Sequence, residues 1–190
     1  MEHLVHRIVR CIAPTIASRK PATLMNITNA NGGLLDAWDY RKNCLFAGSE
    51  IGYYELKRTD KNAIVIFFNH TRLGELLQKR SVTKFLTECG YRSDSIEYTL
   101  SMLRERYAVS GCPPEIGIFL GIPLKDVKGF MGLNSLRNTG CGMWRIYGDP
   151  APSEKRMNEY RSARDAVTRR LFSGEDPVNI IRLCTPDERA

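Results

Sequence analysis

The sequence predicts a single α+β domain in which helices pack on a small, mainly antiparallel sheet. Several separate segments repeat apolar residues at helical spacing, two β-rich segments flank a short polar turn, and helical and strand segments do not alternate regularly. The chain has 190 residues, of which 43% are hydrophobic, so we expect one substantial core and no second one. We therefore treat residues 1–190 as one domain.

The strongest strand signal is a pair of segments within residues 51–69. Residues 51–58 (IGYYELKR) and 63–69 (AIVIFFN) are rich in the β-branched and aromatic residues that favour strands. The four residues between them, TDKN, are typical of a turn. The pattern predicts an antiparallel hairpin, and a further short strand is predicted at residues 144–147 (WRIY).

Helical spacing of apolar residues predicts the remaining elements. We expect helices over residues 2–12, 72–89 with a break near 80–81, from Ser93 or Asp94 to 106, and 153–171. Pro14 and Pro21 predict that the first helix stops and that a short helix leads into irregular or extended chain. Residues 37–48 show no clear period, residues 133–140 are expected to form a polar loop, and residues 178–183 a short strand or helix.

Residues 111–132 read GCPPEIGIFLGIPLKDVKGFMG and predict two short helices joined by a tight corner. Pro113 or Pro114 suits the first turn of a helix, where the missing N–H costs nothing. Gly121 supplies a positive φ at the corner. The segment therefore predicts a helix-turn-helix-like corner near residues 113–131.

Such a corner has two interpretations. The second helix could present cations to a nucleic-acid groove, as in a helix-turn-helix protein. The same glycine and apolar positions also suit an ordinary packed corner, and Asp126 and Gly129 are poor residues for a helix that reads DNA. Both interpretations stay open at this point.

The charge balance bears on the partners of the protein. The formal net charge is +7, and the excess is distributed along the chain. Such a surface attracts phosphates and acidic proteins, although distributed charge also serves solubility. Our leading hypothesis is a non-enzymatic binding or regulatory module that acts on nucleic acid or a nucleoprotein, such as a mobile-element accessory protein or an inhibitor of a nucleic-acid enzyme. The candidate contacts are Lys125, Lys128, Arg137, Arg145, Arg161, Arg164 and Arg169.

Three segments carry a family resemblance: residues 11–24 (CIAPTIASRKPATL), 115–130 (EIGIFLGIPLKDVKGF) and 141–148 (CGMWRIYG). Through them the chain resembles an uncharacterised bacterial family, the domain-of-unknown-function family DUF3793. The resemblance implies a cytosolic bacterial protein and carries no assigned activity. Members of the family tend to have a histidine directly before Glu-Ile-Gly, where this chain has Pro114.

The alternative hypothesis is a cytosolic small-molecule or redox protein. It draws on reactive or polar residues within the three matching segments: Cys11, Lys20, Glu115 and Cys141. A reactive thiolate needs a nearby cation or base, which Lys20 or Arg145 could supply if the fold brings them together. Buried, inert thiols are the simpler interpretation.

Several classes of protein lack their sequence signatures here. We find no P-loop, dinucleotide-binding, nucleophile-elbow or zincin motif, and no C-x-x-C pair, so no cofactor and no metal are expected. No apolar run approaches the roughly 20 residues of a membrane span. Charged residues interrupt the N-terminal segment, which does not resemble a signal peptide. We expect a cytoplasmic protein that does not bind membranes.

Overall fold

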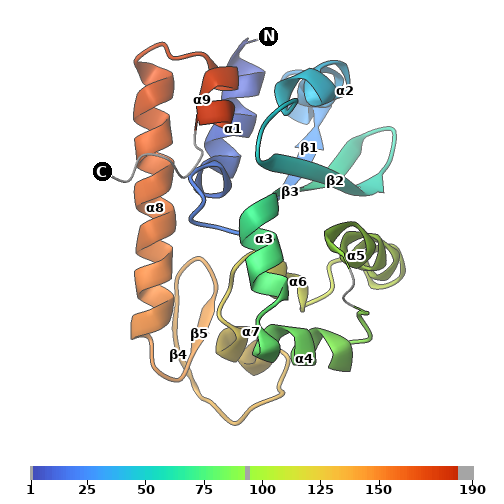
Figure 1. Cartoon of the computed structure of the whole chain (residues 1–190), viewed down its shortest axis with the longest axis vertical. Helices are drawn as coiled ribbons and strands as arrows, with labels where there is room; N and C mark the ends of the chain where they lie inside the picture. Colours follow the sequence, from blue (N-terminus) through green and yellow to red (C-terminus); the bar gives the residue numbers. More distant parts are fainter. Residues whose placement is uncertain (1, 93–94, 184–190) are drawn as a thin grey trace.

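A computed structural model describes the chain except for residues 1, 93–94 and 184–190 (Figure 1). The helices are α1 (Glu2–Ile16), α2 (Leu34–Leu45), α3 (His70–Leu77), α4 (Arg80–Glu88), α5 (Ile96–Ser110), α6 (Ile116–Phe119), α7 (Leu124–Phe130), α8 (Ala151–Phe172) and α9 (Pro177–Leu183), with a 3-10 turn over Asn29–Asn31. The strands are β1 (Ala22–Thr28), β2 (Ile51–Arg58), β3 (Asn62–Asn69), β4 (Asn138–Cys141) and β5 (Arg145–Tyr147). The predicted α+β class is confirmed.

The main sheet has three antiparallel strands in the order β1-β3-β2. The predicted hairpin is confirmed as β2 and β3. The third strand, β1, was expected to be irregular or extended chain, and it pairs with β3 from Ala22 opposite Phe68 to Thr28 opposite Asn62. The central position of β3 explains its nearly continuous apolar sequence, because both of its faces are buried.

The two faces of the sheet carry separate apolar clusters. Ala63, Val65 and Phe67 of β3 pack in one cluster with residues of α1, α2, α8 and α9. Ile66 and Phe68, which point to the opposite face, pack in the other with residues of α3 to α7. In Figure 1 the first group of helices occupies the upper and left parts of the molecule and the second group the lower right.

Helix α1 extends beyond its predicted end. It was expected to stop before Pro14, yet it continues to Ile16 with the proline inside. Pro14 lies in the last turn, so the missing N–H removes only one helical hydrogen bond. Its carbonyl then accepts the backbone N–H groups of Arg19 and Lys20, both at 2.9 Å. The end of α1 therefore fixes the position of Lys20.

Other boundaries also differ from expectation. Helix α2 forms where no period was visible, because few of its residues are buried. Strand β4 begins inside the predicted polar loop of residues 133–140 and extends to Cys141, because it pairs with β5. Ser95 caps α5 by accepting the N–H of Tyr98, and the expected caps, Ser93 and Asp94, lie outside the described residues.

Candidate functional site

The longest helix, α8, lies beside α1 along one side of the molecule (Figure 1). Its inner face was predicted from apolar spacing, and Met157, Tyr160 and Val167 are indeed buried there. Arg7 and Arg10 of α1 line a pocket of about 250 Å³ at this seam, together with His6, Thr168, Leu171 and Phe172. A pair of packed helices thus presents cations along their junction.

Lys20 is placed at the same seam by the end of α1. Its side chain is partly buried, and its Nζ lies 5.6 Å from the centre of the Tyr160 ring. The pKa of Lys20 is lowered to about 8, mainly because burial disfavours the charged ammonium; Cys11 opposes this change, and the positive charge of Arg164 adds to it. Lys20 therefore remains mainly protonated at pH 7 at an energetic cost to the fold.

Cys11 interacts electrostatically with three of the cations at the seam, Lys20, Arg164 and Arg7. Burial raises the pKa of its thiol, and the charges of Lys20, Arg164 and Arg7 offset only part of that effect. The thiol is therefore protonated at neutral pH and is not an activated nucleophile. The structure does bring Cys11 and Lys20 together, as the alternative hypothesis required, but the thiol is in its unreactive form.

We call Arg7, Arg10, Lys20 and Arg164 the seam cluster. Within the described part of the chain, none of the four forms an ion pair with a carboxylate. Arginine and lysine side chains gathered without acidic partners create a positive potential that favours bound anions. From the sequence alone, Arg164 is the one member of this cluster that was predicted to contact a polyanion. The spacing of Arg7 and Arg10, three apart on a predicted helix, was the available signal for the others.

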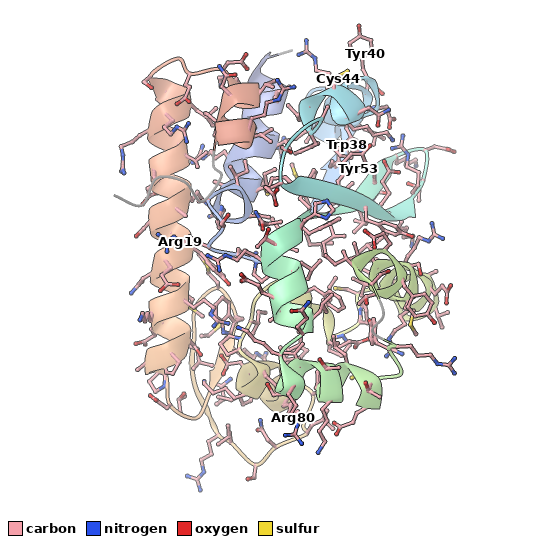
Figure 2. The ribbon with its side chains drawn as sticks, in the orientation of Figure 1. Arg19, Trp38, Tyr40, Cys44, Tyr53 and Arg80 are labelled. Atoms are coloured by element: carbon pink, nitrogen blue, oxygen red, sulfur yellow. The ribbon has the colours of Figure 1, made fainter. Side chains whose placement is uncertain are left out.

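A second pocket, of about 250 Å³, is also lined by arginines, but two of these arginines have partners within the protein. Arg19, which Figure 2 shows between α8 and α3, lines it with Arg72 and Arg156. Arg72 pairs with Glu75, and Arg156 donates a hydrogen bond to a backbone carbonyl, that of Gly121, at 2.9 Å. Because several of these groups already have partners, this pocket is a weaker candidate for an anion site.

Lys125, a predicted contact on α7, is held by the protein itself. Its Nζ donates to Asp126 Oδ1 at 2.7 Å, to the carbonyl of Tyr147 at 2.8 Å and to Ser153 Oγ at 3.1 Å. These bonds use all three donors of the ammonium group. Lys125 thus ties α7 to β5 and α8.

Asp126 is the centre of this arrangement. It is 1% exposed, and it also accepts hydrogen bonds from Trp144 Nε1 at 2.9 Å, the N–H of Tyr147 at 2.8 Å and Ser153 Oγ at 2.6 Å. Burial by itself would raise the pKa of Asp126, but these hydrogen bonds and that from Lys125 keep it below its usual value. The carboxylate is therefore a structural junction.

The other predicted contacts at the corner have different surroundings. Lys128 Nζ lies 5.5 Å from the centre of the Phe85 ring, whereas Arg137 and Arg145 are exposed. A Cβ atom at Gly129 would lie 2.3 Å from Cγ of Tyr147, so this glycine is needed for packing. The predicted corner is present, with Gly121 at φ 75°, and α7 packs against β5.

The predicted arginines of α8 are exposed but do not share one side of the helix. Arg161 precedes Arg164 by three residues and lies next to it on the helix surface. Arg169 follows Arg164 by five positions, which turns its side chain about 140° away around the helix axis. Arg161 thus adjoins the seam cluster, and Arg169 points elsewhere.

The remaining residues of the alternative hypothesis lie in other parts of the fold. Glu115 is buried and accepts hydrogen bonds from Tyr91 Oη at 3.1 Å and Arg106 Nε at 2.5 Å. Cys141 is exposed on β4. Glu115 acts as the partner that neutralises Arg106, and neither residue joins Cys11 and Lys20 at the seam.

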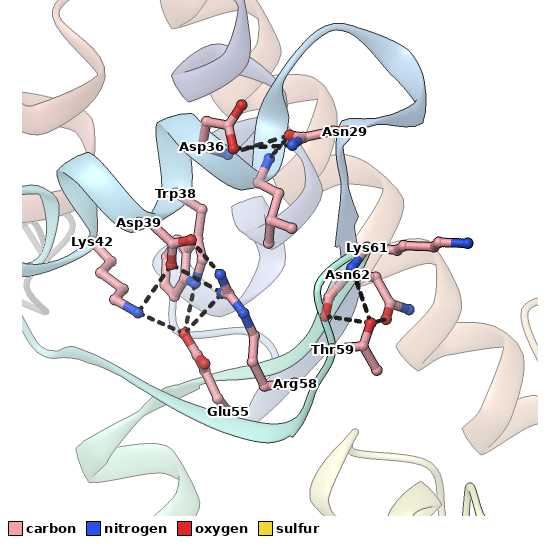
Figure 3. Close-up of polar contacts among 11 residues, drawn as sticks. Asn29, Asp36, Trp38, Asp39, Lys42, Glu55, Arg58, Thr59, Lys61 and Asn62 are labelled. Carbon is pink, nitrogen blue, oxygen red and sulfur yellow. Dashed lines mark hydrogen bonds and ion pairs between the residues drawn. The ribbon is translucent and has the colours of Figure 1, made fainter.

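A charged network between α2 and β2 was not anticipated from the sequence (Figure 3). Asp39 and Glu55 pair with Lys42 and Arg58, and Glu55 also accepts the indole N–H of Trp38 at 2.9 Å. Figure 2 shows Trp38 close to Tyr53, and their ring centres are 4.9 Å apart. Two cations balance two carboxylates here, so the network stabilises the fold and leaves no excess charge for a ligand.

Comparison with known protein families identifies one that matches this chain. The family model described as a protein of unknown function, DUF3793, matches residues 8–181. The chain belongs to the DUF3793 family. The match runs from α1 into α9 and confirms the resemblance found in the sequence. No curated protein and no solved structure matches this DUF3793 chain.

Across the described residues, no group of three or more His, Cys, Asp or Glu side chains is arranged to hold a metal ion. In the same part of the chain, no helix combines the length and apolar character needed to cross a membrane.

Proposed function

We propose that this protein is a non-enzymatic module that binds the phosphate backbone of a nucleic acid or nucleoprotein through the seam cluster. The observation that carries the proposal is the environment of Lys20. Its partly buried ammonium group lies beside Arg164, and neither has a carboxylate partner among the described residues. Uncompensated buried charge destabilises a fold, and a bound anion would supply the missing opposite charge.

The chemistry of the cluster suits phosphate. Arginine presents a planar fork of donors that matches two phosphate oxygens, and lysine adds a compact positive charge. The cluster joins cations from α1, the segment after it and α8, and Arg161 extends it along α8. A chain of phosphates can contact several of these groups at once, which favours a polyanion over a single small anion.

The corner formed by α6 and α7 contributes less to this proposal. Lys125 is fully engaged with Asp126, Tyr147 and Ser153, and Gly129 is fixed by packing against Tyr147. We therefore assign binding to the phosphate backbone and not to base edges. Sequence-independent binding of this kind depends strongly on salt.

The test is a salt titration of binding to labelled single-stranded and duplex oligonucleotides, followed by fluorescence anisotropy. Affinity should fall as salt rises, and Arg164→Ala should reduce the slope of log K against log salt by about 1. Arg169→Ala is the matched control, because it removes the same charge from another side of α8. Absence of binding at low salt, or equal effects of the two substitutions, would reject the proposal.

A further inference from the structure

The corner between α6 and α7 contains an apolar groove whose walls include none of the seam-cluster residues. Its volume is about 560 Å³, and its walls include Pro113, Ile116, Leu120, Val127, Phe130 and Trp144. The groove is formed where α6 and α7 meet the segment before β5. Clefts of this size lined mainly by apolar side chains are typical binding sites.

The segment that begins at Phe130 in the groove wall and leads to β5 also leaves large apolar side chains in contact with solvent. Phe130 and Leu133 are each 57% exposed, Leu136 is 43% exposed and Met143 is 40% exposed. Half of the eight exposed large apolar residues among the described ones therefore fall within residues 130–143. Apolar exposure that extends beyond a pocket is typical of a protein-binding surface and exceeds what a small ligand needs.

Charge indicates what kind of protein would bind there. Asp126 and Arg145 are the charged residues in the groove wall. The carboxylate of Asp126 is already saturated by four donor groups, whereas Arg145 is exposed and makes no ion pair within the described chain. Arg137 is likewise exposed nearby in the sequence. The two exposed charged side chains, Arg145 and Arg137, are therefore both positive.

We propose that this groove binds an acidic segment of a partner protein, with apolar side chains seated in the groove and a carboxylate against Arg145. A second copy of this chain is a poorer occupant, because a symmetric contact would place the same cations opposite one another. Charge complementarity thus selects an acidic partner. The groove residues are separate from the seam cluster, so binding of this partner does not require nucleic-acid binding.

The experiment is selection of a random 16-residue peptide library on the full chain, without nucleic acid. Enriched peptides should combine large apolar residues with Asp or Glu. They should bind about tenfold more weakly to Phe130→Ala and to Arg145→Glu than to the unaltered protein. Val109→Ala and Arg169→Glu are controls, since Val109 is 90% exposed on α5 and Arg169 lies on α8.

Alkylation of exposed cysteines gives a second readout on the unaltered protein. Cys112 lines the groove, whereas Cys44 lies on α2. A selected peptide should slow the alkylation of Cys112 and leave that of Cys44 unchanged. The inference is overturned if no peptide is enriched, if enriched peptides are basic, or if they bind all four variants equally. Self-association that Phe130→Ala abolishes, measured by sedimentation, would assign the groove to a second copy instead.

Discussion

Replacing Lys20 with methionine removes a positive charge that destabilises the fold and that the proposed ligand needs. Methionine keeps an apolar stem of similar length, so the packing against Tyr160 is largely retained. We therefore expect the Lys20→Met protein to be more stable than the unaltered protein at pH 7 and to bind nucleic acid more weakly.

The size of the gain follows from the pKa of Lys20. A pKa lowered from 10.5 to about 8 means that protonated Lys20 costs the folded state roughly 3 kcal/mol at neutral pH. Partial exposure reduces this cost, and the substitution also removes a cation–π contact worth about 0.5–1 kcal/mol. We expect a net gain of about 1–2 kcal/mol in the free energy of unfolding.

The gain should depend on pH. Between pH 8 and pH 10.5 the unfolded chain still holds the proton that folded Lys20 has released, so the stability of the unaltered protein rises with pH. The variant lacks this group and does not share that rise. The difference between the two proteins should therefore shrink as pH increases through this window.

Urea denaturation at pH 7 and at pH 10 measures the gain in the free energy of unfolding and its decrease with rising pH. The control is Lys57→Met, because Lys57 is exposed on β2. Loss of stability in Lys20→Met at pH 7 would refute the reasoning about burial. A gain that stays constant between the two pH values would show that the lysine is not the titrating group.

Two further predictions follow from buried groups. Asp126→Ala should lower the free energy of unfolding by about 3–5 kcal/mol in urea denaturation, because it removes the carboxylate that pairs with Lys125 and accepts hydrogen bonds from Trp144, Tyr147 and Ser153. Asp126→Asn should cost less, since an amide oxygen still accepts, and equal losses would argue against this hydrogen-bonded junction. In native-state alkylation Cys11 should react far more slowly than exposed Cys141, because burial raises the pKa of the Cys11 thiol. A Cys11 that reacts faster than Cys141 would revive the redox hypothesis.

The sequence by itself determined the elements whose patterns are local. The β2–β3 hairpin was visible as β-rich segments around a polar turn, and the inner face of α8 as helical spacing of apolar residues. A break between two helices was expected near residues 80–81, and it lies just before them, between Leu77 and Arg80. The glycine at residue 121 marked the corner, because a positive φ is a local requirement. Family membership was also readable from three short segments.

Only the tertiary structure decided which distant residues meet. Strand β1 is recognisable through its pairing with β3, about 40 residues away, and α2 through a few contacts with the core. The charge pattern could not distinguish Lys125, whose donors are used inside the fold, from Arg164, which lies beside Lys20 and Cys11. Periodicity reports which face of an element is apolar, whereas the positions of charges relative to one another depend on how α1 and α8 pack.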